Sequence, residues 1–151
     1  LPDQPEWVLQ SSQGRVSLAK NLQSEEFNER RQQAFEILQW ILKDEMEERV
    51  RNNLEDWQDR EGALVTCQFL QQALRDCFAF KNSVQPVIHE DMVEKYNDEI
   101  HRVDDELLLE AFQLVQALEL DIQSNKDRKL GVENMIIEMD KKSKGVNHVM
   151  A

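Results

Sequence analysis

The strongest hydrophobic pattern of the chain lies between Asp104 and Asp140. Apolar residues recur there at helical spacing, first over a long segment and, after a polar break at residues 123–127, over a shorter one. The first stripe contains Leu108, Ala111, Phe112, Val115, Leu118 and Ile122, and the second contains Val132, Met135, Ile136 and Met139. The break can end one helix and supply Asn125 or Asp127 as a cap for the next. We expect this helix pair to organise the fold.

Further apolar residues widen both stripes. Leu107, Leu114 and Leu120 flank the first stripe, and Leu130 and Ile137 flank the second. A helix with a wide apolar surface is covered on more than one side. We therefore expect the long helix of this pair to have neighbours on several of its faces.

Upstream, apolar residues at helical spacing predict helices over residues 24–43, 44–54, 58–81 and 90–100. The second of these carries only a narrow apolar seam, Met46, Val50 and Leu54. Residues 82–86 form a loop, because Pro86 and the residue before it both resist helix. With only 4 Gly and 3 Pro and no strand signal, the chain is predicted to be all-α, an antiparallel bundle of about five to six helices.

The pattern divides the chain into three parts. Residues 1–23 form a leading segment, residues 24–140 a single helical domain, and residues 141–151, which begin with a lysine-rich run, a frayed and flexible tail. Because the chain begins with Leu1 and Pro2 instead of Met, we expect it to be a piece of a longer protein.

The formal net charge of −12 argues against direct contact with nucleic acid, since phosphate contacts need Lys and Arg. The acidic residues are concentrated in two segments. Residues 44–61 hold eight acids against three arginines, and residues 90–110 hold nine acids against two basic residues. Such runs are typical of a solvated acidic surface, although they also fit a surface that meets a basic partner.

No combination of residues predicts catalysis. His89, His101 and His148 are scattered, and no motif has the spacing of a metal site, so we expect neither a metal nor a cofactor. Cys67 and Cys77 fall on apolar helix positions, which favours buried thiols in a reducing compartment. No apolar run approaches the ~20 residues of a membrane span. We expect a non-enzymatic protein of the cytoplasm that does not contact membranes.

Surface for a partner remains as the candidate function. Trp57 lies among charged residues, so it is either a cap folded over its own core or an anchor in an interface. Together with Phe80 and Leu109, it is our candidate for an apolar side chain exposed on the isolated domain. These three residues are predicted to meet a neighbouring subunit.

The two ends of the chain carry a resemblance. Asn125, Leu130, Val132, Glu133 and residues 135–137 resemble the end of the C-terminal collar domain in bacterial clamp-loader subunits of DNA polymerase III, above all those of the delta-prime type. Gly14 and Arg15 resemble the last turn of the small domain that follows an AAA+ nucleotide-binding domain, with Arg15 in the sensor-2-like position. There Gln13 replaces the family's proline and Ser11 its glycine.

The resemblance implies a structural role. A collar domain packs beside its sister subunits, here gamma/tau and delta, into a five-membered ring in the bacterial cytoplasm. The sliding clamp and primer-template DNA would be contacted only through the full complex, as would any nucleotidyltransferase activity of the polymerase holoenzyme. The resemblance also implies a nucleotide contact for Arg15. The alternative is an acidic helical adaptor or a mimic of nucleic acid that binds a regulatory partner.

Overall fold

The computed structural model describes residues 24–150 of the chain, and every regular element in that range is a helix. The long helices are α2 (Ser24–Leu42), α4 (Arg60–Lys81), α7 (Asp105–Gln123) and α8 (Arg128–Met150). Shorter elements connect them, namely α3 (Met46–Arg51), the 3-10 helix η2 (Leu54–Trp57), α5 (Glu90–Val93), the 3-10 helix η3 (Glu94–Tyr96) and α6 (Asn97–Arg102). The predicted all-α fold is confirmed.

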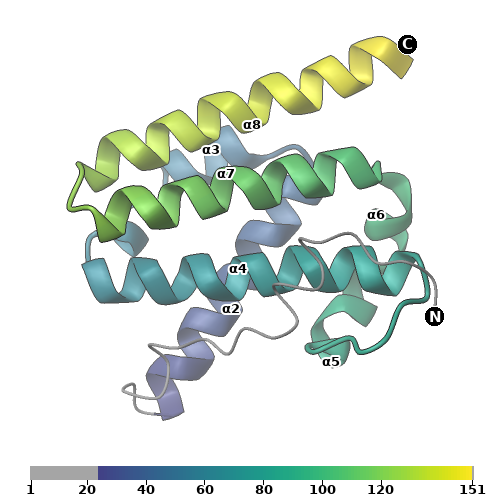
Figure 1. The fold of residues 1–151 in the computed structure, drawn as a ribbon, viewed down its shortest axis with the longest axis horizontal. Coiled ribbons are helices and arrows are strands. Elements are labelled where there is room, and N and C mark those ends of the chain that lie inside the picture. Colours follow the sequence, from purple (N-terminus) through teal and green to yellow (C-terminus); the bar gives the residue numbers. More distant parts are fainter. Residues whose placement is uncertain (1–23, 151) are drawn as a thin grey trace.

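Three long helices lie side by side in one layer, in the order α8, α7, α4 (Figure 1). Helix α7 runs antiparallel to both of its neighbours (Figure 1). A short turn joins it to α8, whereas α5, η3 and α6 form the longer connection between α4 and α7. Helix α2 crosses behind α4 at a steep angle, α3 lies behind α7 and α8, and α5 and α6 cover one end of α4 (Figure 1).

Helix α4 lies at the centre of the core. It packs against α7 on one side and α2 on another, with α5 and η2 at its two ends. Leu70, Leu74 and Cys77 are fully buried, and even polar positions of this helix, such as Gln72 and Asp76, are removed from solvent. The element that the rest surrounds is therefore α4, whereas the sequence pattern pointed to the pair α7–α8.

Aspartates begin three of the long helices. Asp59 accepts a hydrogen bond from the Gly62 N–H at 3.0 Å, Asp104 from the Glu106 N–H at 2.8 Å, and Asp127 from the Leu130 N–H at 3.2 Å. Of the two caps considered for α8, Asp127 is the one used. Asn125 instead adopts a left-handed conformation, with φ at 60°, in the turn that ends α7.

Two glycines mark close approaches between helices. The guanidinium of Arg30 from α2 occupies the space that a Cβ at Gly62 would take, so any other residue in this first turn of α4 would require the end of the Arg30 side chain to move. A Cβ at Gly131 would lie 3.0 Å from Leu118 Cδ1, which shows how closely α8 approaches α7. The unfavourable helix propensity of Gly62 thus has a packing reason.

The boundaries differ from prediction in three places. The helix expected over residues 44–54 is shorter, and the segment 90–100 is split into α5, η3 and α6. Residues 141–150 continue α8 as helix instead of forming a frayed tail, so the expected end at Asp140 is wrong. The narrow seam of α3 is covered nonetheless, since Met46 and Val50 are buried where α3 packs on α8 and α2.

The central position of α4 predicts a strong contrast between two leucines. Replacing the fully buried Leu74 with Ala should lower the free energy of unfolding by about 2–5 kcal/mol, because it leaves a cavity in the core. Leu120 is 58% exposed, so the Leu120→Ala variant should change the free energy of unfolding by less than about 0.5 kcal/mol. Urea unfolding followed by circular dichroism measures both, and equal losses would contradict this description of the core.

Candidate functional site

The residues predicted to meet a partner differ in their exposure to solvent. Trp57 is only 4% exposed, so the prediction that its side chain lies on the surface is wrong. Phe80 and Leu109 are partly exposed, and Phe80 packs against the core with one part of its ring. Arg15 lies outside the described residues. The three interface candidates belong to η2, α4 and α7, and the length of α4 separates Trp57 from Phe80.

Trp57 is buried because η2 folds over the space between two helices. This short helix contacts both α4 and α8, and its last residue turns inward between them. The charged neighbours that set Trp57 apart in the sequence, Glu55 and Asp59, point to solvent instead. Of the two interpretations open from sequence, a cap over the chain's own core is the correct one.

A different set of apolar residues is exposed. Leu120 on α7 is 58% exposed, and Leu130 and Ile137 on α8 are 56% and 44% exposed. Leu130 and Ile137 are seven residues apart, so they share the side of α8 opposite its buried residues. On α7, residues 109, 113, 116 and 120 recur at helical spacing and combine two leucines with two glutamines.

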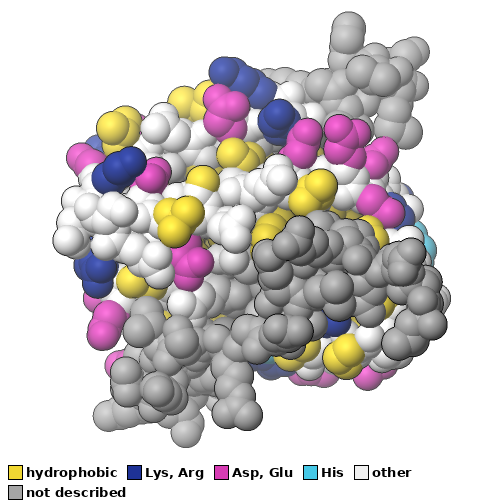
Figure 2. All heavy atoms as spheres, in the orientation of Figure 1, with side chains coloured by type: hydrophobic (Ala, Val, Ile, Leu, Met, Phe, Trp, Pro, Cys, Tyr) yellow, Lys and Arg dark blue, Asp and Glu magenta, His cyan; other side chains and the backbone are white. Residues whose placement is uncertain are grey.

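We call these residues the α7–α8 face; it carries few charges, although the partly exposed Glu133 lies between Leu130 and Ile137 on α8. It consists of Leu109, Gln113, Gln116 and Leu120 on α7 and of Leu130, Asn134 and Ile137 on α8. Figure 2 shows the exposed part of α7 and α8 as mostly white and yellow, with acidic and basic side chains toward its edges. In a chain of which 32% is charged, such an area is unusual.

Ion pairs lie around the α7–α8 face. Lys142 and Glu110 bridge α8 and α7 at 3.7 Å, Lys126 pairs with Asp121 at 3.4 Å, and Lys141 pairs with Glu138 at 3.4 Å. All three pairs have at least one side chain that is about half or more exposed, so each stabilises the fold little. Their placement gives the face a polar rim.

The sequence contained a signal for this face. Leu120, Leu130 and Ile137 flank the apolar stripes of their helices. A stripe that is too wide for one neighbouring helix predicts that further helices of the chain cover it. In the described part of the chain, nothing covers these three side chains. Only the packing of α8 on α7 and α3 decides which half of a wide stripe is turned inward.

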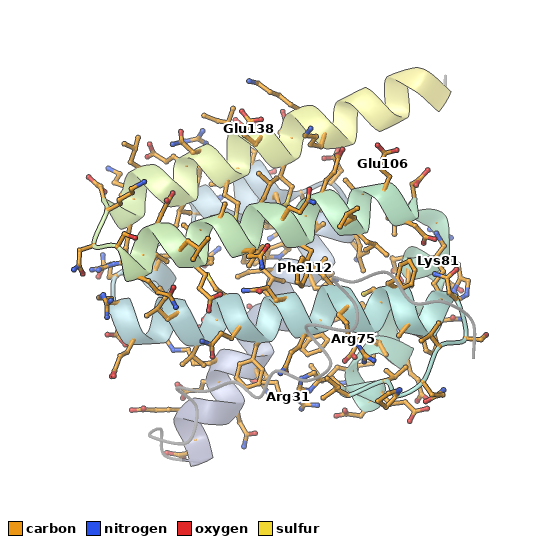
Figure 3. All side chains as sticks on the ribbon, in the orientation of Figure 1. Arg31, Arg75, Lys81, Glu106, Phe112 and Glu138 are labelled. Carbon is orange, nitrogen blue, oxygen red and sulfur yellow. The ribbon has the colours of Figure 1, made fainter. Side chains whose placement is uncertain are left out.

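The second candidate is a buried polar cluster around His89, in the loop that precedes α5. Its Nδ1 accepts a hydrogen bond from Arg31 Nε at 3.0 Å, so Nε2 carries the proton and donates to Gln72 Oε1 at 2.9 Å. The rings of Phe35 and Phe69 contact the imidazole edge-on. Figure 3 shows the two arginines of this region, Arg31 on α2 and Arg75 on α4, on the same side of α4.

The environment of His89 holds it neutral. Burial is the largest cause and lowers the pKa of His89 below its usual 6.5. The carboxylate of Asp76 acts in the opposite direction, and the guanidinium of Arg31 lowers the pKa further. Because both ring nitrogens are occupied and the side chain is buried, His89 is placed to join α2, α4 and the loop, and it has no open position for a substrate.

Asp76 fixes the same loop through its carboxylate. Its two oxygens accept hydrogen bonds from the backbone N–H groups of Ile88 at 2.9 Å and His89 at 2.7 Å, and from Arg75 Nη1 at 2.9 Å. Arg75 and Asp76 are both fully buried. Breaking such a pair leaves an uncompensated charge in the core, which costs about 3–5 kcal/mol. This cluster therefore holds the chain between α4 and α5 in place.

Other chemistry is sparse in the part of the chain that the structure describes. Cys67 and Cys77 are buried free thiols, as predicted, and burial raises the pKa of each well above its usual range. Within residues 24–150 no group of three or more His, Cys, Asp or Glu side chains is arranged to hold a metal ion. None of the helices in that range combines the length and apolar character that crossing a membrane requires.

The lowered pKa of His89 makes the stability of the fold depend on pH. Below pH 6.5 the imidazole of His89 binds a proton in the unfolded chain but stays neutral in the folded chain. The free energy of unfolding should therefore fall as the pH is lowered from 6.5 toward the pKa of His89 in the folded state. Urea unfolding between about pH 5 and 8 measures this slope.

Two variants assign the slope to His89. The His89→Gln variant removes the titrating group and should flatten the dependence over that range. The His101→Gln variant changes an exposed histidine and should keep it. A slope that persists unchanged in His89→Gln would contradict the assignment.

Comparison of the chain with protein-family models, with curated proteins and with solved structures gave no match, so the α7–α8 face and the cluster around His89 are defined by the chain's own residues.

Proposed function

We propose that this chain is a structural domain that joins protein subunits through its α7–α8 face. The observation that carries the proposal is the exposure of Leu120, Leu130 and Ile137 on a face with few charges. Side chains that are about half exposed contribute little to the stability of the fold. They nevertheless expose apolar surface at the cost of solubility.

Helix α8 supports this function by its two apolar sides. Val132 and Ile136 are fully buried against the domain, while Leu130 and Ile137 lie on the opposite side. A helix that is apolar on two opposite sides is suited to lie between two packed bodies. Here the domain supplies one body, and a neighbouring subunit would supply the other.

The partner that fits best is a sister subunit of a bacterial clamp loader. The resemblance of residues 125–137 to the collar end of delta-prime-type subunits falls on α8 and the turn before it, the elements that expose Leu130 and Ile137. In this role the chain performs no reaction of its own. It packs its helices beside gamma/tau and delta subunits, and an interface of standard size would bury about 1,600 Å².

The acidic surface fits the same role. Acidic residues of α5, α6 and the start of α7 are exposed, among them Asp98 and Glu106, and Glu106 lies one turn before Leu109, at the edge of the α7–α8 face. Like charges at the edges of an interface suppress wrong pairings while the apolar centre supplies affinity. The alternative function, an acidic adaptor that mimics nucleic acid, would use these acidic residues as its contact surface instead.

Co-elution with clamp-loader subunits tests the proposal. The chain should elute from a sizing column in a defined stoichiometry with purified bacterial gamma/tau and delta subunits. The double variant Leu130→Asp, Ile137→Asp should lose co-elution, because each buried aliphatic side chain contributes about 1.5–3 kcal/mol. The loss corresponds to an affinity at least about 100-fold weaker.

The matched control is Ile88→Asp. Ile88 is 41% exposed, comparable to Ile137, but lies in the loop before α5. This variant should co-elute like the parent chain, and thermal unfolding should confirm that all variants fold. Co-elution of the double variant at parental strength would contradict the proposal, and binding only to basic DNA-binding proteins would favour the mimic.

A further inference from the structure

A pocket of about 560 Å³ lies at the end of the molecule where α7 turns into α8. Trp57 and Gln58 line it from η2 and the start of α4, and Val132 lines it from α8. The remaining wall is formed by Lys126, Asp127, Arg128 and Lys129. Its volume lies within the range of about 300–1,000 Å³ that is usual for pockets holding compact ligands.

The wall of this pocket is basic although the chain is acidic. Three of its residues carry positive charge and one, Asp127, carries negative charge, in a chain whose net charge is −12. The carboxylate of Asp127 is engaged by the Leu130 N–H as the cap of α8. Figure 2 shows Lys and Arg side chains at this end of the molecule, interspersed with acidic ones.

The basic residues at the pocket also differ from most other basic residues of the described part in whether they form an ion pair. Most arginines and lysines of the described part form ion pairs with a carboxylate, as Arg31 does with Asp91 and Lys81 with Asp105. Lys126 does so as well, with the exposed Asp121. In the described part of the chain no such pair is found for Arg60, Arg128 or Lys129, which lie at or beside the pocket. The same holds for Lys43, Lys95 and Arg102, but those three are scattered over other parts of the fold, whereas Arg60, Arg128 and Lys129 lie together.

Two of these arginines fix the pocket through backbone oxygens. Arg128 donates to the Gln58 carbonyl at 2.7 Å, and Arg60 donates to the Gln123 carbonyl at 3.4 Å. These bonds cross between the start of α4 and the turn from α7 to α8, so they hold the two walls together. The guanidinium charges nevertheless remain without a carboxylate among the described residues.

The start of α8 adds to the positive potential. Helices α3, α4 and α7 all carry acidic residues in their first turn, where the positive end of the helix dipole favours them. The first turn of α8 has none and instead begins with Arg128 and Lys129. Apart from the Asp127 cap, an anion in the pocket would therefore find two basic side chains at the start of α8 that no carboxylate of the described residues pairs with.

We propose that this pocket binds a short acidic segment of a partner protein, with carboxylates on Lys126, Arg128 and Lys129 and an apolar side chain against the aliphatic stems of the wall. The segment has to be short. Beyond the pocket, Asp59 and Asp121 are exposed, so a long polyanion would run onto acidic surface and be repelled.

The same geometry disfavours nucleic acid. Single strands bind by stacking their bases on open aromatic faces along a basic groove, but Trp57 is 4% exposed and offers only an edge. The proposal is independent of the function proposed for the α7–α8 face, because it rests on none of Leu120, Leu130 or Ile137.

Titration of the full chain with two peptides tests this proposal. The probe is a capped hexapeptide in which four glutamates surround a leucine–phenylalanine pair, and the control peptide has glutamine at each glutamate. Backbone amide NMR should show shifts for residues 57–58 and 126–132 with the acidic peptide only. Calorimetry should show affinity that falls as salt is added.

Variants assign the binding to the pocket. Lys129→Glu reverses an exposed charge that the fold does not use, and it should weaken peptide binding about five- to tenfold or more. Lys43→Glu makes the same change on the exposed end of α2 and should leave the affinity within about twofold. Both variants should unfold at the same temperature as the parent chain.

Four outcomes would overturn the proposal. These are no binding at millimolar peptide, equal binding of the glutamine peptide, amide shifts centred away from the pocket, and equal losses in Lys129→Glu and Lys43→Glu. Tighter binding of a short oligothymidine than of the acidic peptide would also overturn it, in favour of a nucleic-acid ligand.

Discussion

The structure depends on the burial of α4, which forces the chain around it to satisfy two charges in the core. Arg75 and Asp76 are both fully buried in the middle of this helix. The carboxylate of Asp76 is stabilised by Arg75 Nη1 and by the backbone N–H groups of Ile88 and His89. The loop before α5 therefore cannot move without exposing a charge to an apolar environment, and His89 extends this constraint to α2 through Arg31.

Because the core closes around α4, the outer surface is free to serve another purpose. Helix α7 faces α4 with one side, as Phe112 in Figure 3 illustrates, and meets α8 with a second. Gly131 allows α8 to lie close to α7. What remains outward on both helices is the α7–α8 face, whose apolar side chains are partly or largely exposed. The fold thus presents two rigid helices to a partner, which limits the entropy lost on binding.

The long helices and most of the core could be predicted from the sequence. Periodic apolar residues located α2, α4 and α7 to within about two residues and also the start of α8, and the cysteines were placed correctly in the core, because these patterns are local. The central role of α4 could not be read in this way. Its polar residues, such as Gln72 and Asp76, are buried by a distant loop, and local periodicity carries no information about such a contact.

The same limit explains the errors in the candidate sites. Trp57 has charged neighbours in the sequence, but as the last residue of η2 its side chain is buried between α4 and α8. These two helices are far from each other along the chain. The reverse holds for Leu130 and Ile137. Their spacing is typical of core residues, but both side chains lie on the exposed side of α8. The basic pocket combines residues 57–58 with residues 126–132, so its charge is diluted in any one stretch of this acidic sequence. Its lysines read separately as ordinary surface residues.

Hydrogen exchange of the chain, alone and mixed with bacterial gamma/tau and delta subunits, tests most directly whether the α7–α8 face joins subunits. In the free chain the amides of α4 should exchange slowest, because they open only when the whole domain unfolds. Adding the subunits should slow exchange in α8 and in the second half of α7 and leave α2 and α5 unchanged. Slowing confined to α2 or α5, or no change in α8, would contradict the account.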